Sequence, residues 1–369
     1  MRPLESIELF SGAGGLALGL HDAGFQHRAL FEWNASAVET LHYNQRMGHP
    51  SLRNCRISRA DVREVDFREF RGIDLIAGGP PCQPFSMGGK AAGMNDVRDM
   101  FPQAIRAVAE AQPQAFIFEN VRGLLRPVFS NYVEFIRLQM EFPGFPISEN
   151  TSWDQNLARL ERHKERVGDK GAELRYRVHV HQANAADYGV PQQRHRVFFI
   201  GFRSDIVTDW SFPQPTHADR VIPDSGKRPW LPLSAAIQDL PAPTDRPSKK
   251  WPNHVLQLGA RAYPGHTGSP LHRPAKALKA GDHGVPGGEN MIVYPDGSLR
   301  YLSVRESARV QTFPDDYVFL GSWTEAMRQL GNAVPVRLAE IVGKSVARAL
   351  SGQELKKSPI PADDSLQSS

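Results

Sequence analysis

A cysteine lies among prolines in the stretch GGPPCQPFS, which covers residues 78–86. This residue, Cys82, is one of only two cysteines in the chain. Proline fixes φ and lacks a backbone N–H, so the stretch is a poor start for a helix or a central strand. A single free cysteine is most often a small buried apolar residue. The loop-forming neighbours instead favour a thiol that is presented in one direction, as reactive thiols are.

Three charged residues further along the chain, Glu119, Arg194 and Arg196, lie where apolar runs end or begin. Glu119 ends the run AFIFENV, where apolar neighbours would raise its pKa, so that it could act as an acid or a hydrogen-bond donor. It could also be a plain helix N-cap. Arg194 and Arg196 lie two positions apart at the start of another run, and we expect them on one face, where they could hold an anion or a carboxylate. Taken singly, either could be a surface arginine.

A glycine-rich turn near the start of the chain, ELFSGAGGLALGL, joins an apolar run to a helical pattern. Its glycines at positions 12, 14 and 15 would let a ligand approach the backbone at the start of a helix. The same turn could be purely structural. Glu32 ends the next apolar run, roughly 20 residues further on, where this topology places a carboxylate for ribose hydroxyls. Trp33 follows it and could stack on a base.

A third strand is expected to end near Asp61 and Val62. Asp61 could equally be a helix cap or a surface acid. Together with the glycine turn and Glu32, these residues favour a ligand of the adenosine type.

Apolar runs alternate with helical patterns through the first half of the chain, which predicts a mostly parallel α/β sheet. The runs cover residues 6–10, 27–33, 72–78, 115–120, 175–184 and 195–203. Because the run 72–78 ends just before Cys82, the cysteine is expected at the carboxyl edge of the sheet, where open α/β folds bind ligands. Glycines at 88, 89 and 93 suit either a mobile lid or an ordinary loop.

The remaining segments predict the domain organisation. Residues 1–203 form a catalytic and cofactor-binding domain, with a polar insertion at 142–174 that contains one helix. Residues 204–323, rich in proline and glycine with scattered basic residues, form a second, irregular domain. Residues 324–350 regain helical periodicity and return to the first domain, and residues 351–369 are a polar, disordered tail.

Composition narrows the classes of function. The chain has 369 residues and a net charge of +4, so it is large enough for more than one domain and permits a polyanionic partner. It has no apolar run long enough to span a bilayer and no signal-peptide pattern. Two cysteines form no disulfide framework and no paired spacing suggests zinc, so no metal is expected. A reducing cytoplasm is the expected compartment.

Taken together, these segments resemble the C5-cytosine DNA methyltransferases. Together with PPCQPFS, five further segments occur in the same order along the chain as the motifs of that family. They are FSGAGG (10–15), ENV (119–121), QQRHR (192–196), RESARVQTFPDDY (305–317) and QLGNAVPV (329–336). The resemblance runs from residue 7 to about 350, apart from 142–174 and 204–298. It implies a Rossmann-like, S-adenosylmethionine-dependent methyltransferase sheet with a second, smaller and irregular target-recognition domain.

The resemblance also implies a cofactor site. Glu32 would bind the ribose diol, Trp33 would stack on adenine, and Asp61 and Val62 would meet the adenine edge. The full set of expected S-adenosylmethionine contacts is Phe10, Gly12, Gly14, Gly15, Leu16, Glu32, Trp33, Asp61, Val62, Pro80 and Asn332.

For catalysis, the resemblance implies that the Cys82 thiolate adds to C6 of a cytosine that is flipped out of a DNA duplex. Glu119 would hydrogen-bond N3 and the exocyclic amine, Arg194 would lie near the base carbonyl, and Arg196 would orient Glu119 or the loop. The expected substrate-binding residues are Gln83, Ser86 and Asn120.

Duplex DNA is the expected partner. A cognate restriction endonuclease that acts on the same sequence without direct contact would be compatible with the resemblance, but the sequence does not predict whether one exists. A monomeric microbial enzyme near the nucleoid is expected. The family often carries a Thr-Leu pair in the second domain, behind the flipped nucleotide. The nearest match here is Ala277-Leu278, so either the threonine role is absent or the pair lies elsewhere.

Two other functions stay open. Some relatives act on tRNA, so an RNA cytosine-5 methyltransferase is possible, although the length of 204–298 favours DNA. A catalytically inactive DNA-binding regulator is the second alternative. The presence of both Cys82 and Glu119 speaks against it, because an inactive copy usually loses one of them. The target sequence, the residues that read it and the role of 142–174 are not predicted.

Overall fold

The computed structural model describes residues 2–81, 99–168, 173–206, 209–244, 246, 249–264, 267–280 and 290–352. Cys82, Gln83, Ser86, the expected lid and nearly all of the expected tail lie outside the described residues. None of the helices within these ranges combines the length and the apolar character that crossing a membrane requires.

Seven strands form one mixed sheet in the order β3-β2-β1-β4-β5-β8-β6, which confirms the predicted α/β fold. The strands β1 to β5 are parallel, whereas β8 runs antiparallel to both of its neighbours, β5 and β6. All six predicted runs are strands. The bounds are β1 Leu4–Leu9, β2 Phe25–Glu32, β3 Arg56–Arg59, β4 Leu75–Gly78, β5 Ala115–Val121, β6 Tyr176–Asn184 and β8 His195–Arg203.

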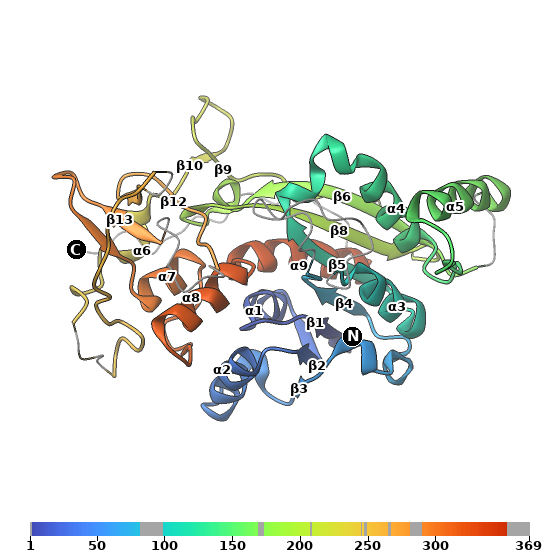
Figure 1. The fold of residues 1–369 in the computed structure, drawn as a ribbon, viewed down its shortest axis with the longest axis horizontal. Coiled ribbons are helices and arrows are strands. Elements are labelled where there is room, and N and C mark those ends of the chain that lie inside the picture. Colours follow the sequence, from blue (N-terminus) through green and yellow to red (C-terminus); the bar gives the residue numbers. More distant parts are fainter. Residues whose placement is uncertain are drawn as a thin grey trace.

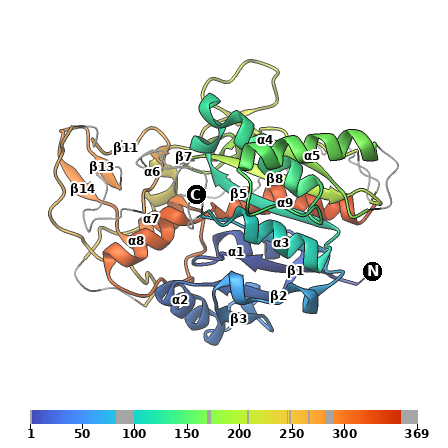
Figure 2. The same cartoon turned by 45° about the vertical axis from the view of Figure 1, so that its right-hand side comes forward.

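Helices cover both faces of the sheet, which is why its central strands are apolar on both sides. On one face, α1 (Gly15–Asp22) and α9 (Val336–Leu350) share a core with β4, β5 and β8. On the other face lie α3 (Phe101–Ala111), α4 (Ser130–Glu141) and α5 (Trp153–Val167). Figures 1 and 2 show these layers, with α5 as the predicted single helix of the 142–174 insertion. The helix α2 (Ala35–Arg46) lies at the β2–β3 end.

The C-terminal segment differs from the single helical stretch expected over 324–350. It consists of two helices, α8 (Trp323–Asn332) and α9, separated by Ala333, Val334 and Pro335. Proline lacks the N–H that a continuous helix needs and pushes the preceding residue out of the helical region. The break matters for function, because it forms a loop that packs against the glycine turn.

The region 204–323 is irregular, as predicted. Within the described residues, its longest elements are the helices α6 and α7 and the antiparallel pair of three-residue strands β13 and β14. One core cluster joins Ala13 and Ala17 of the first part of the chain to Leu233, Leu278 and Ile292 of this region, so the two share a core. The expected boundaries at 203 and 323 therefore stay predictions. The helices and strands of this region are β9 His217–Ala218, β10 Arg228–Pro229, α6 Leu233–Ile237, β11 Ser269–Pro270, β12 Ala275–Lys276, β13 Met291–Val293, β14 Leu299–Tyr301 and α7 Val304–Val310, and β12 pairs with β7 (Gln192–Gln193) of the first part of the chain.

A buried carboxyl lies in the middle of the sheet. Glu8 of β1 is 1% exposed, and its Oε2 has no hydrogen-bond partner. Burial, and then the nearby charge of Glu32, raise the pKa of Glu8 well above its ordinary value. The folded chain thus holds a proton that the unfolded chain releases, so this residue lowers stability as the pH rises above the usual glutamate pKa.

We therefore expect Glu8→Gln to stabilise the protein, by on the order of 1 kcal/mol near pH 8, with a smaller gain near pH 5. Urea unfolding at both pH values would measure the change in the free energy of unfolding. Glu39→Gln, on the exposed side of α2, is the control and should change little at either pH. An equal gain from Glu8→Gln at both pH values would contradict the prediction.

Candidate active site

The expected site residues meet at one edge of the sheet. Strands β1, β2, β4 and β5 are parallel neighbours, so their carboxyl ends lie together. At these ends lie the glycine turn after β1, Glu32 as the last residue of β2, the Gly79–Pro81 segment after β4, and Glu119 near the end of β5. The antiparallel β8 begins at the same edge, where Arg196 is paired with Val121. The sheet thus gathers groups that are more than a hundred positions apart in the chain.

Glu32 is held firmly beside the glycine turn. Its Oε2 accepts a hydrogen bond from the N–H of Gly12 at 2.7 Å, and its Oε1 accepts one from the N–H of Asn34 at 2.7 Å. A carboxylate offers about four acceptor positions, so each oxygen keeps capacity for another donor. That capacity fits the predicted contact with a ribose diol.

Of the residues expected around adenine, Trp33 is free of close packing and Asp61 is engaged in contacts within the protein. Trp33 is 67% exposed, so its indole face is accessible for stacking on a planar ring such as adenine. Asp61 caps the 3₁₀ helix η2 (Val62–Glu64) and pairs with Arg63, whose hydrogen bond lowers the pKa of Asp61. The helix-cap alternative is therefore present. The contacts of Asp61 and the buried Val62 with adenine stay predictions.

The glycine turn is closed from behind by the α8–α9 loop. A Cβ on Gly15 would lie 2.4 Å from the carbonyl oxygen of Val334, so only glycine permits this approach. Asn332, the last residue of α8, is exposed beside this contact. Left-handed φ angles occur at Phe10, Gly12 and Gly14, so the turn curls tightly before α1 begins, while Leu16 is buried beneath it. The predicted closure of the cofactor site by this segment stays a prediction, and the structure shows the segment packed on the glycine turn.

Tyr317 is a member of the site for which we predicted no role, although it belongs to the quoted stretch RESARVQTFPDDY. Its side chain is fully buried, and its hydroxyl donates to the carbonyl of Ala13 at 2.8 Å, inside the glycine turn. A Cβ on Gly14 would lie 3.2 Å from the same hydroxyl. Tyr317 thus supports the turn through Ala13 and Gly14.

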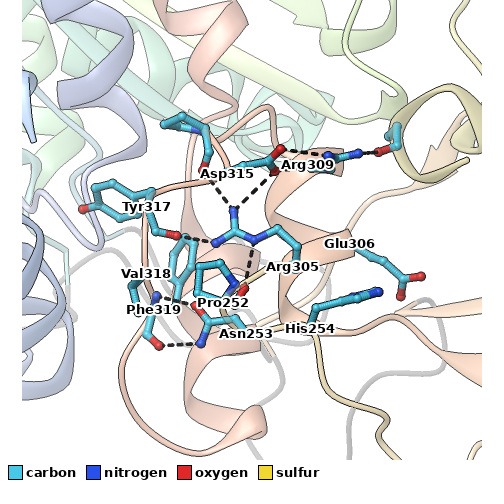
Figure 3. A network of polar contacts seen from close by, with 12 residues as sticks. Pro252, Asn253, His254, Arg305, Glu306, Arg309, Asp315, Tyr317, Val318 and Phe319 are labelled. Atoms are coloured by element: carbon cyan, nitrogen blue, oxygen red, sulfur yellow. Dashed lines mark hydrogen bonds and ion pairs between the residues drawn. The ribbon is translucent and has the colours of Figure 1, made fainter. Parts of the chain in front are cut away.

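Arg305, from the same stretch, holds Tyr317 in place (Figure 3). Its side chain is fully buried, and burial lowers its pKa to about 10. The guanidinium donates to three carbonyls, those of Pro252 at 3.0 Å, Pro314 at 2.9 Å and Tyr317 at 2.5 Å. This network connects the irregular region to the glycine turn through a single tyrosine.

We expect Tyr317→Phe to weaken cofactor binding by about 3–10-fold, because loss of one buried hydrogen bond costs about 1 kcal/mol. Titration calorimetry with S-adenosylhomocysteine would measure the dissociation constant. Tyr43→Phe, on α2, serves as the control for a tyrosine hydroxyl outside the turn. Unchanged affinity in Tyr317→Phe would mean that the hydrogen bond to Ala13 does not shape the cofactor site.

Glu119 and Arg196 form the centre of the expected catalytic group. The Glu119 side chain is buried, and its Oε1 forms an ion pair with Nε of Arg196, as predicted. A Cβ on Gly79 would lie 3.3 Å from Oε2 of Glu119. The carboxylate therefore contacts the segment that leads, three residues later, to Cys82.

Asn120 anchors that same segment. Its Nδ2 donates to the carbonyl of Pro80 at 2.9 Å, and its Oδ1 accepts the N–H of Val121 at 2.8 Å. On the other side of the loop, Met100 donates its N–H to the carbonyl of Pro81 at 3.1 Å. The family resemblance implies that Asn120 binds substrate and that Pro80 lines the cofactor. The structure gives both a role in holding the segment that precedes Cys82, and their ligand contacts stay predictions.

Arg194 does not lie where we expected it. Its side chain is 1% exposed and donates to three carbonyls, those of Leu278 at 3.0 Å, Gly331 at 2.5 Å and Ala333 at 2.9 Å. Strand β8 begins only at His195, so the alternation that would place Arg194 beside Arg196 does not extend to it. This arginine ties protein segments together, and its expected contact with the base carbonyl stays a prediction.

Gln192 completes this internal connection and was not predicted. It is fully buried, accepts the N–H of Leu278 at 3.0 Å and donates to Oε1 of Gln311 at 3.1 Å. Both backbone groups of Leu278 are thus bound by the QQRHR stretch. The segment that contains Ala277-Leu278 therefore does reach the catalytic edge, although Ala277 has no hydroxyl.

The chain is similar in sequence and fold to known proteins. A sequence model described as C-5 cytosine-specific DNA methylase matches residues 4–153 and 155–348. Type II methyltransferase M.NgoMIV of Neisseria gonorrhoeae is 33% identical over 359 residues, and the match covers 94% of this chain and 97% of that protein. Type II methyltransferase M.AplI of Arthrospira platensis is 32% identical over 363 residues, covering 95% and 87%. The crystal structure of S. pombe Dnmt2 methyltransferase has the same fold, with a TM-score of 0.60, 17% identity and coverage of 95% and 99%.

Proposed function

Because the chain belongs to the C-5 cytosine-specific DNA methylase family and is a DNA cytosine-5 methyltransferase that uses S-adenosylmethionine, we propose that it acts through a covalent bond between Cys82 and the target base. One observation carries this proposal. The buried pair of Glu119 and Arg196 lies against Gly79, at the base of the loop that contains Cys82. A group that can recognise a pyrimidine therefore lies next to the segment that precedes the nucleophile by three residues, at the ligand-binding edge of the sheet.

The first step makes the cytosine reactive. C5 of cytosine is a poor nucleophile, so the Cys82 thiolate adds to C6 and the electron pair of the C5–C6 bond moves toward C5. Glu119 hydrogen-bonds N3 and the exocyclic amine, which stabilises charge that develops only as the sulfur adds. Arg196 holds the carboxylate in that orientation. The prolines around Cys82 keep the thiol above the ring, where attack on C6 is possible.

The second step transfers the methyl group. S-adenosylmethionine supplies an electrophilic methyl carbon when it is bound. C5 bonds to this carbon while the bond between the methyl group and sulfur breaks. Loss of the C5 proton to solvent then restores the double bond and expels the Cys82 thiolate. In a duplex the base stack covers the ring face that the thiol attacks, so the cytosine is flipped out, with Gln83 and Ser86 on the loop beside it.

The cofactor residues fit this donor. The Glu32 carboxylate, fixed by Gly12 and Asn34, has free acceptor positions for the ribose diol. Trp33 is exposed and stacks on the adenine, and Asp61 and Val62 lie at its edge. The glycine turn, supported by Tyr317 and by the α8–α9 loop, contacts the methionine part.

Several finer points belong to the same proposal. Residues 204–323 read the target sequence, with basic side chains that mainly bind phosphates. The protein acts as a monomer near the nucleoid of a microbial cell. A restriction endonuclease that cleaves the same sequence is its partner in a restriction–modification system, without direct contact.

Methyl transfer from labelled S-adenosylmethionine to mixed genomic duplex DNA, and in parallel to total tRNA, tests the proposal. We expect label in DNA, at cytosine C5, and none in tRNA. Label in tRNA alone would contradict the choice of DNA. Absence of label in both would favour a regulator that only binds DNA. Sequencing of methylated DNA from an expressing host would then identify the target.

A further inference from the structure

One loop of the irregular region stands out from the rest of the molecule. It covers residues 219–227, between β9 and β10, and both views show it projecting above the sheet (Figures 1 and 2). Its tip exposes two neighbouring aliphatic side chains, Val221 at 43% and Ile222 at 71%. Single exposed apolar residues are ordinary. Two adjacent aliphatic side chains at a projecting tip, between the exposed Arg220 and Lys227, indicate a surface that binds a partner.

The base of this loop is firmly anchored. Asp187 accepts the N–H of Thr216 through its carbonyl at 2.9 Å and the indole N–H of Trp230 through its carboxylate at 2.9 Å. The N–H of Trp230 also donates to the carbonyl of Ala218 at 3.0 Å. Asp219, at the start of the loop, pairs with Arg273 at 3.2 Å. The tip is therefore presented by a fixed base rather than exposed by fraying.

The anchor lies at the catalytic edge. Asp187 is part of the 3₁₀ helix η7 (Ala185–Tyr188), which follows β6 directly. The last residue of β6, Asn184, is paired with His195, and the next residue of β8, Arg196, pairs with Glu119. The loop thus rises from the side of the sheet where the target base must enter.

A second segment with the same chemistry leaves the same edge. Strand β5 ends at Val121, and the two 3₁₀ helices that follow, η5 (Arg122–Leu125) and η6 (Pro127–Phe129), expose Arg122, Arg126 and Val128. Val128 is 75% exposed. In both views the start of α4, directly after this segment, lies on the same side of the molecule as the 219–227 loop. Two segments that leave the catalytic edge on the same side of the molecule therefore carry exposed aliphatic and basic side chains together.

We propose that these two segments, 219–227 and 122–128, contact the duplex beside the flipped base. Arg220, Lys227, Arg122 and Arg126 bind phosphates, and Ile222 and Val128 rest in the minor groove. This inference rests on the proposed function. Its physical basis is charge complementarity at a protein with a net charge of only +4, where local basic groups must hold the polyanion. Aliphatic tips beside basic groups are the chemistry of minor-groove contacts.

Fluorescence anisotropy of the full chain with a labelled mixed-sequence duplex of about 30 base pairs tests the proposal across ~50 to ~200 mM salt. Each phosphate contact contributes about 0.9 to the slope of log K against log salt. We expect the double variant Arg220→Ala/Lys227→Ala to lower that slope by about 1.8. Ile222→Ser and Val128→Ser should weaken binding several-fold at every salt concentration without changing the slope.

Matched controls lie on surfaces away from the catalytic edge. Arg71→Ala removes an exposed arginine near the amino end of β4, and Met47→Ser removes a side chain that is 66% exposed at the end of α2. Neither should change the slope or the affinity. Unchanged slopes in the double variant, or equal losses in the controls, would overturn the proposal. The dissociation constant of S-adenosylhomocysteine, expected to be unchanged in all variants, reports folding. Failure of the proposed function can be told apart from failure of this inference, because in the former case the unaltered protein would transfer no label to DNA.

Discussion

Cys82→Ala is expected to abolish methyl transfer, with a loss of about 10⁴-fold or more, as seen when an enzyme loses its nucleophile. The reason is that a covalent route depends on one atom, the sulfur that adds to C6. Binding energy and electrostatic stabilisation remain in the variant but act on a base whose C5 is unreactive. The site residues around the loop keep their positions, because Asn120 and Met100 hold Pro80 and Pro81 through backbone carbonyls.

The chain offers a matched control in its other cysteine. Cys55 is 6% exposed, and burial raises its pKa to about 12, so it is an unreactive thiol. Cys55→Ala should retain methyl transfer. A duplex that contains 5-fluorocytosine separates the two cysteines directly, because fluorine at C5 blocks the final elimination. The unaltered protein and Cys55→Ala should form a complex that survives denaturant, and Cys82→Ala should form none. Full activity in Cys82→Ala would refute the covalent mechanism.

Arg194→Met is expected to cost about 3–5 kcal/mol of folding stability, the second large effect. The variant removes the donors of three hydrogen bonds and leaves the carbonyls of Leu278, Gly331 and Ala333 in a buried place. Burial already lowers the pKa of Arg194 well below its ordinary value, which reflects how completely water is excluded. Carbonyls without donors in such a place retain the full cost of lost hydration.

Urea unfolding would measure this loss, with Arg71→Met as the exposed control, expected to change stability by less than about 0.5 kcal/mol. Arg194→Lys should recover part of the difference, since an ammonium has donors but lacks the planar fork. Cofactor affinity should also fall in Arg194→Met, because Ala333 packs on the glycine turn. A loss of stability below about 1 kcal/mol would mean that the carbonyls find other donors.

The features that could be predicted from the sequence depend on local chemistry. Strands are apolar runs bounded by glycine, proline and polar residues, so their positions were predictable, and the sheet order then places the residues after each parallel strand at one edge. Glu32 and Glu119 lie at this edge for that reason, and Arg196 pairs with Glu119 as expected. Even the break at Pro335, which we did not predict, is visible as a proline within a helical pattern.

Only the tertiary structure decided what the remaining polar residues do. Tyr317 meets Ala13 across 304 positions of the chain, and Arg194 meets Ala333 across 139. No periodicity reports such a contact, because it depends on how segments with no local relation pack on one core. Arg194, which binds backbone carbonyls, and Arg196, which pairs with Glu119, have the same side chain and stand two positions apart in QQRHR. The sequence alone determined that two positive charges stand here. The fold decided that Arg194 is buried against the carbonyl of Leu278 and that Arg196 lies beside Glu119.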